Sequence, residues 1–254
     1  MGFLHEGHLS LVRESKKKCE LTFVSVFVNP TQFAPSEDLQ SYPRDLENDK
    51  NLLEKENVDY FFLPDEKEIY PENFQTYVNV ELIPKKLEGE FRPTHFRGVA
   101  TVVLILFNSI SPDFAFFGQK DAQQIAVVRQ MVRDLKLNIE IFECPIIREK
   151  DGLALSSRNI YLSKEERLDA IVLNHSLELA KNKVTSGERR VSFILSDVNE
   201  LISKATSASL DYLKIVEADS FEPVEELITE KEYYILIACK IGKTRLIDNL
   251  KIKV

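Results

Sequence analysis

Apolar and polar positions along the first 150 residues follow two alternating periods. Short apolar runs typical of strands buried on both faces occur at 23–28, 58–63, 114–117 and 139–147. Apolar residues at helical spacing predict helices over 9–14, 38–57, 98–110 and 121–135. A proline-rich stretch over 64–95 is irregular, with one strand predicted at 77–82. Strands that alternate with helices predict an α/β domain with a parallel sheet.

The rest of the chain, 151–254, follows a different pattern. A capping-box sequence at Ser163 predicts a helix to residue 184, and a second amphipathic helix is predicted over 191–205. Strands are predicted at 212–216, 233–241 and 244–252, and the last two are separated by Gly242-Lys243, which is typical of a hairpin turn. Helices followed by antiparallel strands predict a smaller α+β domain, so we expect domains at 1–150 and 151–254.

Composition narrows the class of protein. The 254 residues are 44% hydrophobic and 29% charged, as in an average soluble globular protein, and the net charge is −8. No basic excess indicates a nucleic-acid or membrane partner, and no apolar run is long enough to cross a membrane. The three cysteines are scattered, and the N-terminus lacks the basic leader and apolar core of a signal peptide. The sequence therefore predicts a cytoplasmic protein.

Two histidines stand near the N-terminus, in His5-Glu6-Gly7-His8, directly before a predicted helix. In the first turn of a helix, residues three apart share one face, beside the backbone N–H groups that bind phosphate. Gly7 would let a ligand come close to the backbone. The spacing also fits a two-histidine metal site, although no nearby cluster supplies further ligands, or a polar terminus without a function. Spacing alone leaves these three interpretations open.

Two later segments carry groups that suit a nucleotide. Phe117-Gly118-Gln119-Lys120-Asp121 follows a predicted strand and opens a helix, where parallel sheets bind nucleotides. Lys120 suits a phosphate, and Asp121 suits a sugar hydroxyl or the helix N-cap. The segment Gly152–Asn159 contains two serines and an arginine, whose hydroxyls and guanidinium suit polyphosphate oxygens. Taken alone, each segment is equally typical of an ordinary loop.

Neutral amide side chains follow strand ends in the same domain. Gln32 and Gln124, together with Asn29, can hydrogen-bond hydroxyls and carboxylates without adding charge. The chain has no Gly-x-Gly-x-x-Gly and no Gly-x-Ser-x-Gly sequence, which argues against a dinucleotide oxidoreductase and an α/β-hydrolase. Four of the eight glycines lie in or beside the three candidate segments. Because glycine lets the backbone come close to a ligand, the three segments taken together favour a binding function more than each does alone.

Taken together, the chain resembles the pantoate–β-alanine ligase (pantothenate synthetase) family along its whole length. The segments that carry the resemblance are MGFLHEGHLSLV at 1–12, FVNPTQF at 27–33, YPRD at 42–45, LEG at 87–89, RPTHFRGV at 92–99, FGQKDAQQ at 117–124, LSSRN at 155–159 and TRLIDN at 244–249. The His-x-Gly-His element alone is shared with a wider nucleotidyltransferase superfamily, whereas several other segments are specific to this family.

The resemblance implies a Rossmann-like nucleotidyltransferase domain, a smaller α+β domain and a homodimer. It implies ATP-dependent joining of (R)-pantoate to β-alanine through pantoyl adenylate, with release of pyrophosphate and AMP. It implies catalytic roles for His8, as proton donor, and for His5 and Lys120, on phosphate oxygens. The implied ATP site comprises Met1, Gly2, Phe3, Leu4, His5, Glu6, Gly7, His8, Gly118, Gln119, Lys120, Asp121, Ile147, Leu155, Ser156, Ser157 and Arg158. The implied pantoate site comprises Gln32, Gln124 and Asn29, and Mg²⁺ is expected to accompany ATP, with Asp49 as a contact.

Two departures from the family pattern stand out. Gln119 occupies a position where many members have glutamate, and we expect little effect because Lys120 and Asp121 are present. Members also carry a segment before the matched methionine, including a central strand, whose loss would cost more than a typical stability of about 5–15 kcal/mol. We therefore expect that the chain starts at an internal methionine, is shortened, or is completed by another chain. Another His-x-Gly-His nucleotidyltransferase and an inactive truncated homologue are the alternatives.

Overall fold

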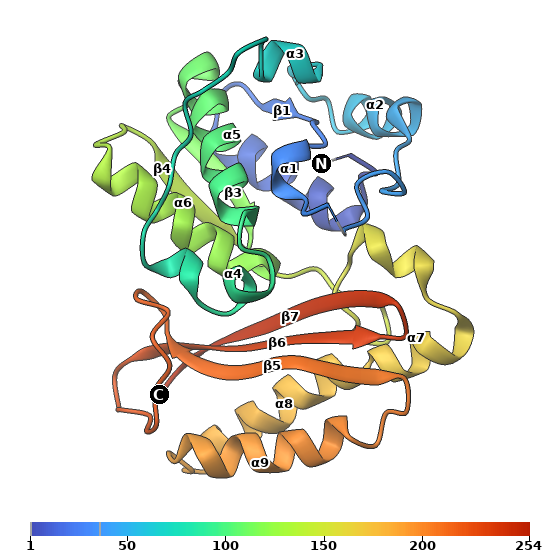
Figure 1. Cartoon of the computed structure of the whole chain (residues 1–254), viewed down its shortest axis with the longest axis vertical. Coiled ribbons are helices and arrows are strands. Elements are labelled where there is room, and N and C mark those ends of the chain that lie inside the picture. The colour runs from blue at the N-terminus through green and yellow to red at the C-terminus, as the bar shows by residue number, and fades with distance from the viewer. Residues whose placement is uncertain (1, 36) are drawn as a thin grey trace. The chain divides into compact units, whose positions relative to one another are not determined.

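The computed structural model describes residues 2–35 and 37–254, and the chain divides into two compact units between Pro145 and Ile146 (Figure 1). This division lies close to the boundary expected at residue 150. Met1, which the resemblance assigns to the nucleotide site, lies outside the described residues. In the described ranges, no helix is both long enough and apolar enough to cross a membrane.

The first unit alternates short parallel strands with helices, as the sequence predicts. β1 (Phe23–Ser25) pairs in parallel with β2 (Tyr60–Phe62), and β3 (Phe114–Gly118) pairs in parallel with β4 (Glu140–Cys144). The helices and 3-10 turns of this unit are α1 (Glu6–Lys18), η1 (Pro30–Gln32), α2 (Leu46–Lys55), α3 (Glu66–Ile69), η2 (Ile83–Lys85), α4 (Glu88–Phe91), α5 (His95–Ile110), η3 (Gln119–Asp121) and α6 (Ala122–Asp134). The expected α/β class with parallel strands is therefore confirmed.

These parallel strands form two separate pairs, whereas the sequence pattern predicts one sheet. Within residues 2–35 and 37–254, no further strand pairs with β1 or with β3. β1 also ends at Ser25, short of the predicted end at Val28. The N–H of Val26 still donates to the carbonyl of Phe62 (3.0 Å), but β2 ends there and the ladder has no further partner.

Two predicted elements differ from the structure because side chains accept hydrogen bonds from backbone N–H groups in these segments. The strand expected at 77–82 does not form, since the N–H of Val78 donates to the Oγ1 of Thr101 on α5 (3.0 Å). The helix expected over 38–57 begins only at Leu46, where the carboxylate of Asp45 accepts a hydrogen bond from the N–H of Asn48 (3.1 Å) and caps the helix.

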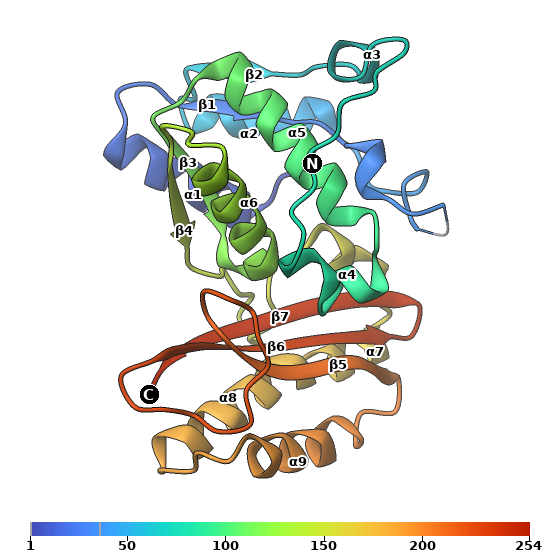
Figure 2. The ribbon, with the colours of Figure 1, turned by 60° about the vertical axis from the view of Figure 1, so that its left-hand side comes forward.

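The second unit packs its helices against one face of an antiparallel sheet of order β5-β6-β7 (Figure 2). Its elements are η4 (Ser157–Tyr161), α7 (Lys164–Ala170), α8 (Val172–Thr185), α9 (Val191–Ile202), β5 (Ala208–Glu217), β6 (Glu232–Ile241) and β7 (Thr244–Lys253). The predicted helix over 163–184 is interrupted at Ile171. The predicted hairpin is present, and Gly242 in its turn has a φ of +56°, which favours glycine.

Candidate active site

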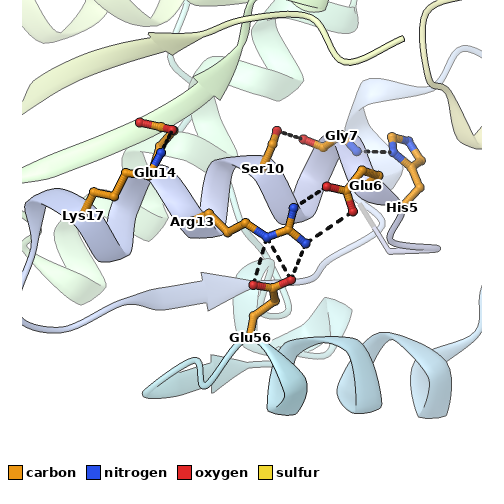
Figure 3. A network of polar contacts seen from close by, with 8 residues as sticks. All are labelled: His5, Glu6, Gly7, Ser10, Arg13, Glu14, Lys17 and Glu56. Carbon is orange, nitrogen blue, oxygen red and sulfur yellow. Dashed lines mark hydrogen bonds and ion pairs between the residues drawn. The ribbon is translucent and has the colours of Figure 1, made fainter. Parts of the chain in front are cut away.

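The helix expected over 9–14 begins earlier, at Glu6, so the segment His5-Glu6-Gly7-His8 forms the N-terminus of α1. His5 is the N-cap residue, and its Nδ1 accepts a hydrogen bond from the N–H of Gly7 (3.2 Å; Figure 3). The Nδ1 of His8 accepts in turn from the N–H of His5 (3.2 Å). The two rings, whose centroids are 4.0 Å apart, thus form a capping box in which histidines replace the usual hydroxyl and carboxylate.

This capping box fixes which nitrogen of each ring carries the proton. A backbone N–H can only donate, so both Nδ1 atoms are unprotonated and both Nε2 atoms carry the proton. The pKa of His8 lies well below its ordinary value of 6.5, first because the ring is desolvated and then because nearby positive charge, including that of Lys120, opposes its protonation. In this arrangement both imidazoles at the start of α1 are uncharged and present their Nε2–H groups as donors, and His8 stays uncharged at neutral pH.

Asp49 holds the backbone that leads into this helix. Its side chain is buried on α2, with 1% of the residue exposed. One carboxylate oxygen accepts from the N–H of Phe3 (2.9 Å) and the other from the N–H of Leu4 (2.6 Å). Gly2 and Phe3 have φ values of +86° and +53°, so the chain bends sharply at this point. Asp49 therefore fixes a bent segment immediately before the N-cap.

An ion-pair network fastens the first turn of α1 to the end of α2. The guanidinium of Arg13 contacts the carboxylate of Glu6 and donates through Nε to both oxygens of Glu56 (3.1 Å each; Figure 3). These carboxylates raise the pKa of Arg13, so the guanidinium stays charged. Glu6, which the resemblance assigns to the ATP site, is therefore tied to Arg13.

The second candidate segment lies at the carboxyl end of β3. The strand ends at Gly118, η3 contains Lys120, and α6 follows at once. A Cβ added to Gly118 would meet no described atom within 4 Å, so this strand end faces open space. Because Lys120 contributes to the lowered pKa of His8, the structure brings this segment near the start of α1.

Asp121 and Gln124 lie on the two sides of the junction between η3 and α6. Asp121 is exposed and makes no side-chain cap to α6, so the structure does not bear out its predicted role as helix cap. Gln119 and Gln124 are half-buried beside it. The groups available at the end of β3 are thus a cation, a carboxylate and neutral amides.

Asn29 and Gln32 are buried at the η1 turn, with 1% and 6% of each residue exposed. The Nδ2 of Asn29 donates to the Oε1 of Gln32 (2.9 Å) and to the carbonyl of Gly98 (3.1 Å). Its Oδ1 accepts from the N–H and hydroxyl of Thr31 and from the hydroxyl of Tyr70. Asn29 is therefore hydrogen-bonded to its neighbours through both the Nδ2 and the Oδ1 of its amide, and it holds Gln32 in place.

The backbone carbonyl of Gln32 is held by two further side chains. Its carbonyl accepts from Arg92 (3.3 Å) and contacts the Nδ1 of His95 (3.0 Å). Desolvation and the charge of Arg92 lower the pKa of His95 to about 4, so the ring is neutral and its Nδ1–H is the donor. Arg92 is itself paired with Glu37 (2.7 Å). Gln32 is consequently fixed at both its side chain and its backbone.

The predicted nucleotide residues of the second unit form one loop. The N–H of Leu155 donates to the carbonyl of Ile147 (3.0 Å), which joins two of them directly. The hydroxyl of Ser156 caps η4 by accepting from the N–H of Arg158 (3.3 Å), and Ser157 is buried. Arg148 pairs with the buried Asp248 of β7 (2.6 Å) and anchors the loop to the sheet.

The structure shows no preformed metal site in residues 2–35 and 37–254. No three His, Cys, Asp or Glu side chains there gather as ligands for an ion. Both oxygens of Asp49 already accept backbone N–H groups. The residues therefore do not fit a magnesium ion held by the protein alone, and the assignment of Asp49 as a magnesium contact stays a prediction.

Sequence reasoning missed the residues that position the site. The 92–99 segment carries part of the family resemblance, but no role was expected for His95 or Gly98. A Cβ on Gly98 would lie 2.5 Å from the carbonyl oxygen of Thr31, so only glycine lets α5 approach η1 this closely. Tyr70 gave no signal in the sequence, because its contact with Asn29 depends on the folding of residues 41 positions apart.

Comparison with known proteins identifies close relatives. The family model for pantoate-beta-alanine ligase matches residues 1–251. The chain is 54% identical over 254 residues to the pantothenate synthetase of Caldicellulosiruptor saccharolyticus, covering 100% of this chain and 90% of the relative. It is 53% identical over 249 residues to that of Pseudothermotoga lettingae, covering 98% and 88%.

Solved structures agree with these sequence matches. Pantothenate synthetase from Thermus thermophilus matches with a TM-score of 0.96 at 44% identity, covering 100% of this chain and 91% of that one. The pantoate-beta-alanine ligase from Francisella tularensis, complexed with beta-gamma ATP and beta-alanine, matches with a TM-score of 0.78 at 35% identity, covering 98% and 86%. This chain therefore belongs to the pantoate–β-alanine ligase family and is a ligase.

Proposed function

We propose that the chain joins pantoate to β-alanine in two steps that consume ATP. A carboxylate oxygen of pantoate attacks the α-phosphorus, the bond to the oxygen bridging the β-phosphorus breaks, and pyrophosphate leaves. The amine nitrogen of β-alanine then attacks the acyl carbon of pantoyl adenylate. The bond to the AMP oxygen breaks, the nitrogen loses a proton, and pantothenate and AMP leave. Membership of the family supports the ligation, and the relative complexed with ATP and β-alanine supports these two substrates.

The observation that carries this proposal is the pair of Nε2–H donors at the start of α1. Backbone N–H groups and the positive end of the helix dipole favour phosphate here. His5 and His8 add donors without adding charge. His8 is uncharged at neutral pH, so we assign it hydrogen bonding to the α-phosphate oxygens as negative charge develops, in place of proton transfer.

The remaining groups position the two reactants. Lys120 would hold phosphate oxygens, with Gly118, Gln119 and Asp121 beside it. We also assign nucleotide contacts to Ile147 and Leu155–Arg158, as the family resemblance implies. Gln32 and Gln124 would bind pantoate through neutral amides, with Asn29 supporting Gln32. An amide donates to a carboxylate without neutralising it, so the nucleophile keeps its charge.

Two further parts of the proposal concern magnesium and assembly. Mg²⁺ commonly binds one or two carboxylates together with substrate phosphates, so we propose that it enters with ATP, and we assign it no step. We also propose that the ligase is a cytoplasmic homodimer, as the family resemblance implies. Its three cysteines, Cys19, Cys144 and Cys239, are free thiols, which suits a reducing compartment.

Isotope exchange tests the first step by itself. With ATP, magnesium and pantoate but no β-alanine, we expect labelled pyrophosphate to enter ATP, and with β-alanine we expect AMP. ¹⁸O in the pantoate carboxylate should appear in AMP. Exchange that needs no pantoate, or AMP without ¹⁸O, would contradict the adenylate route.

Substitution of His8 tests the donor role. His8→Ala should slow exchange by about 10²–10³-fold, the typical cost of losing one donor to a developing oxyanion. His175, which is exposed on α8, provides the matched control, and His175→Ala should exchange at the normal rate. Normal exchange by a folded His8→Ala protein would reject the role of His8.

A further inference from the structure

The orientation of the Gln32 amide follows from partners that can act in only one way. The N–H of Thr31 must donate, so the atom of Asn29 that it meets is Oδ1. The carbonyl of Gly98 must accept, so the atom of Asn29 that it meets is Nδ2. Nδ2 also meets the Gln32 side chain, so the contacting atom of Gln32 is Oε1. The NH₂ group of Gln32 is thus the end of its amide turned away from Asn29.

Two hydroxyls converge on the Oδ1 of Asn29. The Tyr70 hydroxyl donates to it over 2.8 Å and the Thr31 hydroxyl over 2.9 Å, and the two hydroxyls lie 3.1 Å apart. The Tyr70 ring is fixed by edge-on packing against Phe74, with centroids 5.0 Å apart. Desolvation raises the pKa of Tyr70, so its hydroxyl keeps the proton that it donates. Tyr70 therefore holds Asn29 from a part of the chain distant in sequence.

We infer that Tyr70 is a positioning residue that acts through Asn29 to keep the NH₂ group of Gln32 directed at an acceptor oxygen of the acid substrate. The inference rests on the proposed function, in which this substrate is pantoate. An NH₂ group at this place selects a carboxylate or hydroxyl oxygen as partner. If Asn29 tilts, Gln32 loses the hydrogen bond to its Oε1, and its amide can rotate to present the acceptor end instead.

The test measures pantoate binding to the intact chain by calorimetry, alongside the kinetics of pantoate-dependent exchange. Tyr70→Phe removes only the hydroxyl, so we expect pantoate to bind about three- to tenfold more weakly, the effect of one neutral hydrogen bond. The KM for ATP and the rate at saturating pantoate should stay near those of the unsubstituted protein. Tyr77 packs edge-on against the same Phe74 and is 41% exposed, so Tyr77→Phe is the matched control and should bind pantoate normally.

A double substitution separates positioning from general stability. If Tyr70 acts through Gln32, Tyr70→Phe should weaken pantoate binding no further when Gln32 is already replaced by alanine. Additive losses in the double variant would overturn the inference. Normal pantoate binding by Tyr70→Phe would also overturn it, as would equal losses for pantoate and ATP.

Thr31→Val provides a second route if Tyr70→Phe does not fold. It removes the other hydroxyl that donates to the Oδ1 of Asn29, and we expect the same selective loss of pantoate binding. An unchanged affinity for pantoate would count against positioning through Asn29. Failure of the proposed function gives a different result. If Gln32→Ala binds pantoate normally, or the unsubstituted chain does not bind it, the pantoate site itself is wrongly assigned, and the inference falls with it.

Discussion

The two units of this ligase are stabilised in different ways. The second unit has three strands of ten residues each over a continuous apolar core that includes Leu173, Ile194 and Ile235, all fully buried. The strands of the first unit are only three to five residues long. Several of its buried side chains are polar, and they hold backbone: Asp49 accepts two N–H groups, and the Nε2 of Gln123 donates to two carbonyls.

This contrast relates stability to function. An apolar core is non-directional, whereas a buried hydrogen bond fixes both distance and angle. In the first unit, the side chains that we assign to substrates at the start of α1 and at η1 are held by such hydrogen bonds. We therefore expect core substitutions in the second unit to lower stability most, and polar substitutions in the first to change substrate binding most.

The largest effect on stability should come from the second unit. Leu173→Ala should lower the free energy of unfolding by about 2–5 kcal/mol, because it leaves a cavity at a residue with 0% exposure. Leu168 is 72% exposed on α7, so Leu168→Ala is the control and should change little. Chemical denaturation measures both. A loss below about 1 kcal/mol for Leu173→Ala would contradict an apolar core as the main support of this unit.

A smaller effect on stability, with a larger effect on the nucleotide, is expected at Asp49. In Asp49→Asn an NH₂ group faces a backbone N–H, so one charged hydrogen bond is lost, at about 1.5–3 kcal/mol. The segment before His5 should loosen and the KM for ATP should rise. Glu47 is exposed on the same turn of α2, so Glu47→Gln removes the same charge without touching this segment. Equal KM values for ATP in the two variants would contradict the role of Asp49 in holding the segment before His5.

A third effect on stability depends on pH. Folding lowers the pKa of His95 to about 4, while the unfolded chain takes up the proton near 6.5. The free energy of unfolding should therefore fall as the pH is lowered from about 6.5 to about 4. His95→Asn keeps a donor for the Gln32 carbonyl but does not titrate, so its stability should fall less. His8 contributes in the same direction in both proteins. If the free energy of unfolding depends on pH identically in both proteins, a neutral, buried His95 is contradicted.

Local patterns allowed much of the fold to be predicted. The spacing of Ile125, Val128 and Val132 predicted α6 to within a residue at each end, because a regular apolar face specifies a helix by itself. A helix was expected directly after His5-Glu6-Gly7-His8, and it begins within this segment, at Glu6. The strand expected at 77–82 failed because its backbone bonds to Thr101, a partner that no local pattern reveals.

The residues that position the site could not be predicted either, because their partners lie far away in the sequence. Asp49 reaches Phe3 and Leu4 from more than 40 positions away, and Tyr70 reaches Asn29 from 41. The family resemblance implied a magnesium contact for Asp49 and a substrate contact for Asn29. In the structure, both side chains hold backbone or a neighbouring amide. Sequence thus indicated the groups suited to chemistry, while the groups that orient them emerged only from the fold.

The protonation of His8 tests the central claim most directly, because the proposed use of ATP depends on a neutral ring that donates through Nε2. ¹⁵N NMR of the imidazole distinguishes the two ring nitrogens and their protonation. At neutral pH we predict a proton on Nε2, none on Nδ1, and no protonation of Nδ1 until the pH is well below 6.5. A charged imidazolium at neutral pH, or a proton on Nδ1, would contradict the capping box and the donor role built on it.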